Sequence, residues 1–249
     1  MTKLGQALQD SKAAKVAEIA ILFVVAIAMI GIGWKIVGEN IFARQAVVWF
    51  ANIIMMAIVW AGLRLRGQTW EHFGLTFGFR GWRPLVRTVL WSIPVLIAAL
   101  LSFVAGEVIM RIVMQGAAPE LQKADMSSYA YLQGNLPMFL LTMAGVYIVS
   151  SFGEEILYRG FLINRLTEFG KGGRRIRIIA AVISAIIFGL IHFSWGITGV
   201  VATTVMGLAL AAAYFLTKRN LWVLVLAHAY LDTMLLVPLY LAPSAAPAG

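Results

Sequence analysis

Long apolar segments dominate this chain, and short polar segments separate them. Each is long enough for a helix to cross the hydrocarbon core of a bilayer. The first apolar segment follows a basic stretch, as the apolar region of a signal peptide does. However, Trp34 and Lys35 come after it in place of the small residues of a cleavage site, so we treat it as a membrane span. The pattern predicts an all-α, polytopic bundle of about seven spans, or eight helices, over residues 17–37, 43–63, 85–114, 136–164, 177–194, 197–217 and 221–241.

Composition narrows the class of protein further. Hydrophobic residues make up 61% of the 249 residues and charged residues only 12%, whereas soluble domains are about one quarter charged. The chain has no cysteine, which excludes disulfides, thiolate metal sites and a cysteine nucleophile. A net charge of +9 would suit nucleic acid, but the basic residues lie in the short segments between spans, so we expect a lipid bilayer as partner and no nucleic acid.

The basic residues predict the orientation of the bundle. Fifteen of the twenty Lys and Arg residues fall on one side of the predicted spans. The positive-inside rule therefore predicts a cytoplasmic N-terminus and an external C-terminus. The fifteen are Lys3, Lys12, Lys15, Arg64, Arg66, Arg80, Arg83, Arg87, Arg165, Lys171, Arg174, Arg175, Arg177, Lys218 and Arg219.

Three segments are not predicted to span the membrane. Residues 67–83 mix Trp, Phe and Arg and are expected at the cytoplasmic interface, with His72 as an interfacial polar residue. Residues 116–137 are polar and are expected to form an external loop. Residues 242–249 are expected to be a disordered tail. Glu107 and Arg111, four residues apart within a span, have the spacing of a helical ion pair.

Ionisable side chains inside spans are rare because each costs roughly 2.5–3.5 kcal/mol to insert, and they are therefore candidate functional groups. Glu155 and Arg159 are four residues apart and share a helix face, whereas Glu154 points away from them. His228 and Asp232 have the same spacing on the last span. The predicted depths of these groups differ by about two helical turns. The full set is Glu154, Glu155, Arg159, His192, His228 and Asp232, and it includes two of the three histidines.

Such a set allows two kinds of hydrolytic chemistry. A glutamate can take a proton from water while histidines hold the water or protonate a leaving amine, and donors on another helix stabilise an oxyanion. Alternatively, Glu154, His192, His228 and Asp232 could bind zinc, which would then activate the water. HExxH and GxSxG are absent from the sequence, so zincins and serine hydrolases gain no support.

At these residues the chain resembles the CPBP family, which includes CAAX prenyl endopeptidases and bacteriocin-processing enzymes. The EExxxR motif is matched by Glu154, Glu155 and Arg159, and FxxxH by Phe188 and His192. The last motif, HxxxN or HxxxD, is matched by His228 and Asp232. The three motifs occur in the family's order, each on a separate predicted span, and cover residues 136–236.

The resemblance implies an intramembrane endopeptidase whose site opens toward the cytoplasm. Glu154 would be the general base, His192 its partner on the water, and His228 with residue 232 the oxyanion-stabilising pair. Glu155 and Arg159 would hold the site in shape, and Phe188 would pack. Residue 232 is Asp, where the prenyl-protein proteases carry Asn, so it is expected to be protonated, to orient His228, or to bind a metal. We favour metal-independent chemistry and leave zinc open.

The resemblance also divides the chain and places it in the cell. Residues 1–135 would be N-terminal spans and residues 136–241 the catalytic helical core, in a bacterial cytoplasmic membrane and acting on a peptide or protein substrate. A non-catalytic scaffold or immunity-type protein of the same fold is the main alternative. A proton-coupled carrier is disfavoured because the chain has no internal repeats or paired broken spans. The sequence gives neither the substrate nor the oligomeric state.

Overall fold

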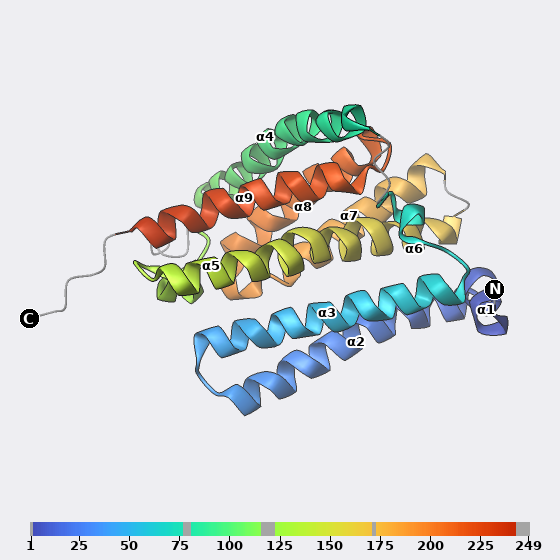
Figure 1. Cartoon of the computed structure of the whole chain (residues 1–249), viewed down its shortest axis with the longest axis horizontal. Coiled ribbons are helices and arrows are strands. Elements are labelled where there is room, and N and C mark those ends of the chain that lie inside the picture. Colours follow the sequence, from blue (N-terminus) through green and yellow to red (C-terminus); the bar gives the residue numbers. More distant parts are fainter. Residues whose placement is uncertain (1, 77–80, 116–122, 171–172, 243–249) are drawn as a thin grey trace, which may run out of the picture.

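The computed structural model describes residues 2–76, 81–115, 123–170 and 173–242. Within these ranges the chain is a helical bundle without strands, and its main helices run along the long axis of the molecule (Figure 1). Short 3-10 turns join them: η1 (Trp70–Phe73), η3 (Ser127–Leu132), η5 (Glu168–Gly170) and η6 (Phe193–Trp195). The main helices are α1 (Lys3–Asp10), α2 (Lys12–Val37), α3 (Ile41–Leu65), α4 (Trp82–Val113), α5 (Leu136–Gly145), η4 (Val146–Leu162), α6 (Ile163–Thr167), α7 (Arg174–Leu190), α8 (Gly196–Leu216) and α9 (Leu221–Leu241).

The all-α membrane bundle predicted from the sequence is confirmed. Six helical segments of the described chain have the length and hydropathy to cross a bilayer, and many of their large apolar side chains are exposed, as lipid-facing surfaces require. The remaining predicted span corresponds to α7, whose 17 residues are at the lower end of the length that can cross the hydrocarbon core. The chain is therefore an integral, multi-pass membrane protein.

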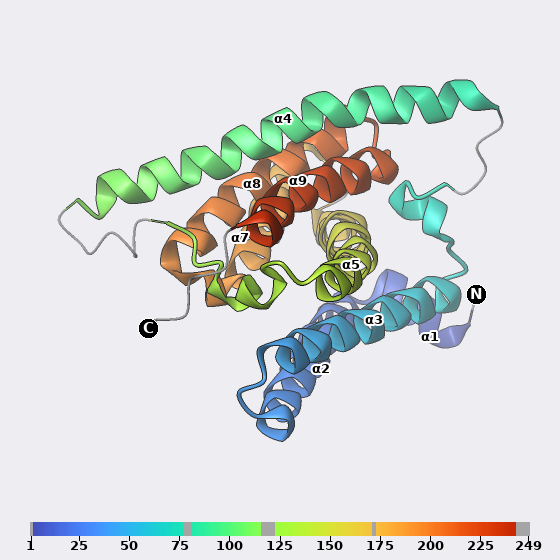
Figure 2. The ribbon, with the colours of Figure 1, turned by 60° about the vertical axis from the view of Figure 1, so that its left-hand side comes forward.

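One continuous rod of helix, formed by α5, η4 and α6, occupies the middle of the bundle. Figure 2 shows it almost end-on, with α4, α8 and α9 on one side and the pair α2 and α3 on the other. The η4 segment packs against α3, α7 and α9, and 13 of its 17 residues are buried. Polar side chains on η4 are thus kept away from lipid by neighbouring helices.

The middle of this rod is not α-helical. Residues Val146–Leu162 form π-helix, in which the backbone hydrogen bonds run from residue i to i+5 and each turn is wider than in an α-helix. Short π-helical insertions are frequent at functional sites. From the sequence, a single uniform helix is predicted here, because the pattern of apolar residues in this run does not distinguish an α-helix from a π-helix.

The two polar segments between spans are more buried than expected. In the segment 67–83, Phe73 and Leu75 are fully buried against the bundle, and the Tyr214 hydroxyl donates a hydrogen bond to the Phe73 carbonyl. The external segment forms η3, whose Leu132 is also fully buried. Residues 77–80, 116–122 and 243–249, and with them nearly all of the expected tail, lie outside the described residues.

The expected ion pair within α4 is wrong. Glu107 accepts a hydrogen bond from the backbone N–H of Ala124 at 3.2 Å, and in the described part of the chain it forms no ion pair with Arg111. A carboxylate near the external end of α4 thus holds the segment that leads to η3. Helical spacing allowed the ion pair, but a backbone donor on a neighbouring segment competes for the same oxygen.

Glycine permits a close crossing of two helix backbones between α4 and α8. A Cβ on Gly106 would lie 2.5 Å from the Ala202 Cα, whereas a Cβ on Gly31 would meet no atom within 4 Å. Small residues allow helix backbones to approach closely in membranes. We expect Gly106→Ala to lower the free energy of unfolding by about 1–3 kcal/mol through overpacking. Thermal unfolding in detergent checks this, and the matched Gly31→Ala variant should unfold at or above the wild-type temperature.

Candidate active site

The π-helical segment brings the carboxylate pair into the protein interior. Glu154 is 7% exposed, Glu155 is 0% exposed and Arg159 is 1% exposed. Uncompensated charge at such depth is costly. The partners of these three side chains therefore indicate how the site is organised.

Glu155 is held from two directions. Its Oε1 accepts a hydrogen bond from Arg159 Nη1 at 2.8 Å, and the same oxygen lies 2.9 Å from His228 Nδ1. Because a carboxylate oxygen only accepts, His228 Nδ1 carries the proton in this contact. The expected pairing of Glu155 with Arg159 is present in the structure, and Glu155 additionally fixes the ring of His228, which the spacing did not predict.

His228 lies between two carboxylates. Its Nε2 faces Asp232 Oδ1 at 3.7 Å, which is too long for a hydrogen bond. The second oxygen, Asp232 Oδ2, accepts a hydrogen bond from the Ser151 hydroxyl at 2.7 Å. Asp232 is thus oriented by Ser151 and lies beside His228, while His228 Nε2 keeps its hydrogen-bonding capacity. Ser151 was not predicted as a site residue from the sequence, although its position close to the two glutamates on the same segment could have indicated a place in the site.

Glu154 differs from its neighbour. The buried Oε2 atoms of Glu154 and Glu155 both lack a hydrogen-bond partner in the described part of the chain, but Glu155 is paired through Oε1, whereas Glu154 forms no ion pair there. A carboxylate oxygen that is both buried and unpaired is costly unless water or a substrate occupies it. Of the two glutamates, Glu154 is therefore the one that no cationic side chain pairs with among the described residues.

Phe188 connects the remaining groups. Its ring lies under the Arg159 guanidinium at 4.3 Å, 4.9 Å from the His192 ring and 6.1 Å from the His228 ring. His192 Nδ1 pairs with the Phe188 carbonyl at 2.8 Å, which leaves Nε2 of this half-buried ring without a hydrogen-bond partner among the described residues. Among the described residues His192 forms no hydrogen bond with Glu154 or His228, so the structure brings it to the edge of the cluster.

A tyrosine from the external segment approaches the same region. Burial and the negative charge of Asp232 and Glu154 raise the pKa of Tyr129, so its phenol remains protonated at neutral pH. Tyr129 lies on η3, which packs against α9. Its place in a polar loop gave no sign that it is close enough to feel the charges of Asp232 and Glu154.

The side chains do not form an evident metal site. Within the described ranges, no three His, Asp or Glu side chains are grouped so that they could hold a metal ion. His228 Nδ1 is already committed to Glu155 and His192 Nδ1 to a carbonyl. A catalytic zinc site needs three protein ligands around one open position. We therefore derive no step through a metal.

The buried cluster is suited to acid–base chemistry on a bound carbonyl. It contains an unpaired carboxylate, an imidazole that another carboxylate fixes through Nδ1, and a cation that neutralises this second carboxylate. These are the parts needed to activate water and to stabilise a developing oxyanion. The two carboxylates and the cation lie on η4, and the imidazole lies on α9.

Comparison with known proteins identifies a family for the segment that carries this cluster. Residues 136–234 match the family model described as type II CAAX prenyl endopeptidase Rce1-like. No curated protein and no solved structure matches the chain. The matched residues run from the start of α5 into α9 and include every member of the cluster except Tyr129. Residues 136–234 are therefore an Rce1-like domain of the type II CAAX prenyl endopeptidase family, carried by a multi-pass membrane protein.

Proposed function

We propose that the protein is an endopeptidase that hydrolyses peptide bonds of membrane-associated substrates with water activated by Glu154. The observation that carries the proposal is the contrast within the buried pair: Glu155 is held through Oε1 by Arg159 and His228, whereas Glu154 forms no hydrogen bond or ion pair among the described residues. The type II CAAX prenyl endopeptidase match supports a peptide substrate near the membrane.

In the proposed reaction, the Glu154 carboxylate takes a proton from a water molecule held with His192 Nε2. The hydroxide oxygen bonds to the scissile carbonyl carbon, and the C=O π pair moves onto oxygen as an oxyanion. The C–N bond then breaks as the proton from Glu154 is delivered to the leaving nitrogen. The oxyanion re-forms the carbonyl as the C–N bond breaks, so the products are a carboxylic acid and an amine, which ionise to a carboxylate and an ammonium group, and no covalent intermediate with the protein forms.

His228 is the donor that we assign to the oxyanion. Glu155 holds its ring through Nδ1 at 2.9 Å, so Nε2 is left to donate toward the substrate. Asp232, 3.7 Å from Nε2, would favour the protonated ring. This role agrees with the second option for the Asp at this position, that of orienting His228. Arg159 acts indirectly, by balancing the charge of Glu155.

The remaining assignments concern the domains, the membrane and the orientation of the chain. We propose residues 136–241 as the catalytic unit and residues 1–135 as spans that surround it, in a cytoplasmic membrane with the N-terminus on the cytoplasmic side. The non-catalytic scaffold and the zinc-dependent protease remain the alternatives. Retained function after Glu154→Gln would favour the scaffold, and loss of cleavage in chelator would favour zinc.

The substrate can be found by comparing membranes of cells that express the wild type, Glu154→Gln or Glu39→Gln. Glu39 is an exposed external glutamate that pairs only with Arg44 in the described chain, so it is a matched control. Mass spectrometry of new peptide termini should detect products in the wild type and in Glu39→Gln that are missing in Glu154→Gln. Identical termini in all three samples would contradict the proposed function.

Substitutions of Asp232 test how this residue supports the reaction. Asp232→Asn keeps an oxygen for the Ser151 hydroxyl and adds an N–H donor, so cleavage should continue. Asp232→Ala removes the carboxylate that lies beside His228 Nε2 and would favour the protonated ring, and we expect kcat to fall by about 10- to 100-fold. Steady-state kinetics on a substrate peptide measure both. A larger loss in Asp232→Asn than in Asp232→Ala would contradict this role.

A further inference from the structure

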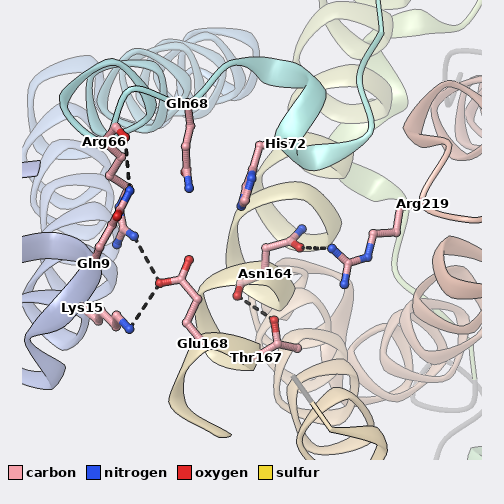
Figure 3. A pocket seen from close by; sticks show the side chains of 9 residues that line it. All are labelled: Gln9, Lys15, Arg66, Gln68, His72, Asn164, Thr167, Glu168 and Arg219. Atoms are coloured by element: carbon pink, nitrogen blue, oxygen red, sulfur yellow. Dashed lines mark hydrogen bonds and ion pairs between the residues drawn. The ribbon is translucent and has the colours of Figure 1, made fainter. Parts of the chain in front are cut away.

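A second polar site lies at the cytoplasmic end of the bundle, away from the carboxylate cluster. It is a cavity of about 440 Å³ between α1, α2, η1, α6 and the α8–α9 turn (Figure 3). Its lining is almost entirely polar, which is unusual for a chain with so few charges. The lining residues are Gln9, Lys15, Arg66, Gln68, His72, Asn164, Thr167, Glu168 and Arg219.

Positive charge exceeds negative charge around this cavity. Glu168 is contacted by Lys15 at 3.6 Å, Arg66 at 3.1 Å and Arg165 at 2.7 Å. The second carboxylate, Glu18, also pairs with Arg66 and Arg165. Arg219, on the opposite wall, donates a hydrogen bond to the neutral amide of Asn164 at 3.0 Å and forms no ion pair with a described residue. Four cations thus face two carboxylates, and both carboxylates are already neutralised.

Unused donors point into the space that these charges surround. Figure 3 shows the side chains of Gln68 and His72 entering the cavity from η1 and the segment before it, between Glu168 on one side and Asn164 with Arg219 on the other. The Gln68 amide oxygen is taken by Arg165 at 3.1 Å, which leaves its NH₂ group to donate. Within the described chain, no hydrogen bond reaches that NH₂ group or the His72 ring.

The electrostatic potential in the cavity is positive. The pKa of His72 is lowered by partial desolvation and by Arg165, Arg219 and Arg66, against an opposing effect of Glu168. Desolvation by itself disfavours any charge, but the contributions of Arg165, Arg219 and Arg66 reflect nearby positive charge, which attracts an anion. The Nε atom of Arg66 has no hydrogen-bond partner among the described residues, whereas Arg165 Nε lies 3.4 Å from Glu18 Oε2.

We propose that this cavity binds a phosphate-bearing anion, with Lys15 and Arg219 as the charged contacts and Gln68 and His72 as further donors. A phosphate group accepts several hydrogen bonds from different directions, and Arg and Lys bind it more strongly than neutral donors do. The cavity lies at the end of the bundle that the positive-inside rule places in the cytoplasm. Basic pockets at that level of a membrane protein bind anionic lipid headgroups.

Binding of an anion at this site would also affect how the helices are held together. It joins α1 and α2 to α6 and the α8–α9 turn, so a bound anion would link the N-terminal helices to the end of the rod that carries the carboxylate cluster. Binding to the folded state stabilises it in proportion to ligand concentration. Thermal stability of the full-length protein therefore reports occupancy independently of any cleavage activity.

The test uses the full-length protein in phosphatidylcholine nanodiscs, with two probes. One arm adds inorganic phosphate, and the other replaces part of the phosphatidylcholine with phosphatidic acid. Lys15→Gln and Arg219→Gln each remove one charge that faces the cavity. Arg175→Gln removes one exposed charge on the same side of the membrane and is the matched control. Lys15→Arg keeps the charge. Each thermal shift is measured against the ligand-free form of the same variant.

At least one probe should raise Tm in the wild type, in Lys15→Arg and in Arg175→Gln. The apparent affinity should fall about tenfold in Lys15→Gln and in Arg219→Gln, as expected for the loss of one charge-assisted contact. A response to inorganic phosphate identifies a soluble phosphate as sufficient, and a response to phosphatidic acid alone identifies a lipid headgroup. The proposal is overturned if neither probe raises Tm, or if Arg175→Gln weakens binding as much as the cavity variants do.

Discussion

Replacing Glu154 with Gln is expected to lower kcat by about 10²- to 10⁴-fold, the usual contribution of a general base. Gln keeps the size of the side chain but cannot take a proton from water. Because Glu154 Oε2 has no hydrogen-bond partner in the described chain, the substitution breaks no observed hydrogen bond of that oxygen. The substrate KM should change little. Steady-state cleavage of a substrate peptide by purified protein in proteoliposomes gives both constants.

Two controls separate chemistry from folding in this experiment. The Glu154→Gln variant should unfold at a temperature equal to or above that of the wild type, since a buried carboxylate without a partner is costly. Glu39→Gln, on the external surface, should leave kcat unchanged. A Glu154→Gln protein that is folded and cleaves at the wild-type rate would show that another group activates the water.

The largest effect on stability is expected for Arg159→Leu. Arg159 is 1% exposed, and its guanidinium is 2.8 Å from the fully buried Glu155 carboxylate. Removing one partner of a buried ion pair leaves an uncompensated charge and costs about 3–5 kcal/mol. The stacking of Arg159 on Phe188 would be lost at the same time. Denaturant unfolding in mixed micelles, followed by circular dichroism, should show this decrease.

Arg44→Leu is the matched control for that prediction. Arg44 also pairs with a glutamate at 2.7 Å, but the glutamate, Glu39, has a side chain that is 89% exposed. Exposed pairs contribute about 0–1 kcal/mol, so this variant should unfold almost like the wild type. A double variant, Arg159→Leu with Glu155→Leu, should recover part of the loss because it removes both charges. Equal destabilisation by Arg159→Leu and Arg44→Leu would contradict the burial argument.

The sequence predicted the membrane architecture well because hydrophobicity alone determines it. Each apolar run corresponds to a helix, and the helix ends fall at most a few residues from the predicted limits, as for 221–241 and Leu221–Leu241. Segment 136–164 was also predicted as one rod. Its π-helical middle was not, since a run of apolar residues is compatible with either helix type.

The members of the cluster could be predicted from the sequence because an ionisable side chain is costly to place inside a membrane span. Their hydrogen-bond partners could not be predicted. An ionisable residue inside a span stands out in any sequence, which is why Glu154, Glu155 and His228 were found. The bond from His228 to Glu155 joins residues 73 positions apart, and no local spacing encodes such a contact. Ser151 was missed for the same reason, since its partner is 81 positions away.

The cytoplasmic cavity shows a second limit of sequence analysis. Lys15, Arg66 and Arg219 were correctly counted as basic residues on one side of the bundle, but counting treats each as an independent orientation signal. Their grouping around one cavity depends on how α2, α3 and the α8–α9 turn pack. Glu18 and Glu168, which neutralise part of this charge, lie at the ends of helices where the hydrophobic pattern gives no contact information.

The central claim is that this protein cleaves peptide bonds with water activated by Glu154, and one measurement tests it most directly. Purified wild-type protein in proteoliposomes, with chelator present, is incubated with a substrate peptide identified from the membrane comparison, and mass spectrometry follows the new carboxyl terminus. We predict that this terminus appears with the wild type and not with folded Glu154→Gln. An intact peptide with the wild type, or cleavage that Glu154→Gln performs equally well, would contradict the claim.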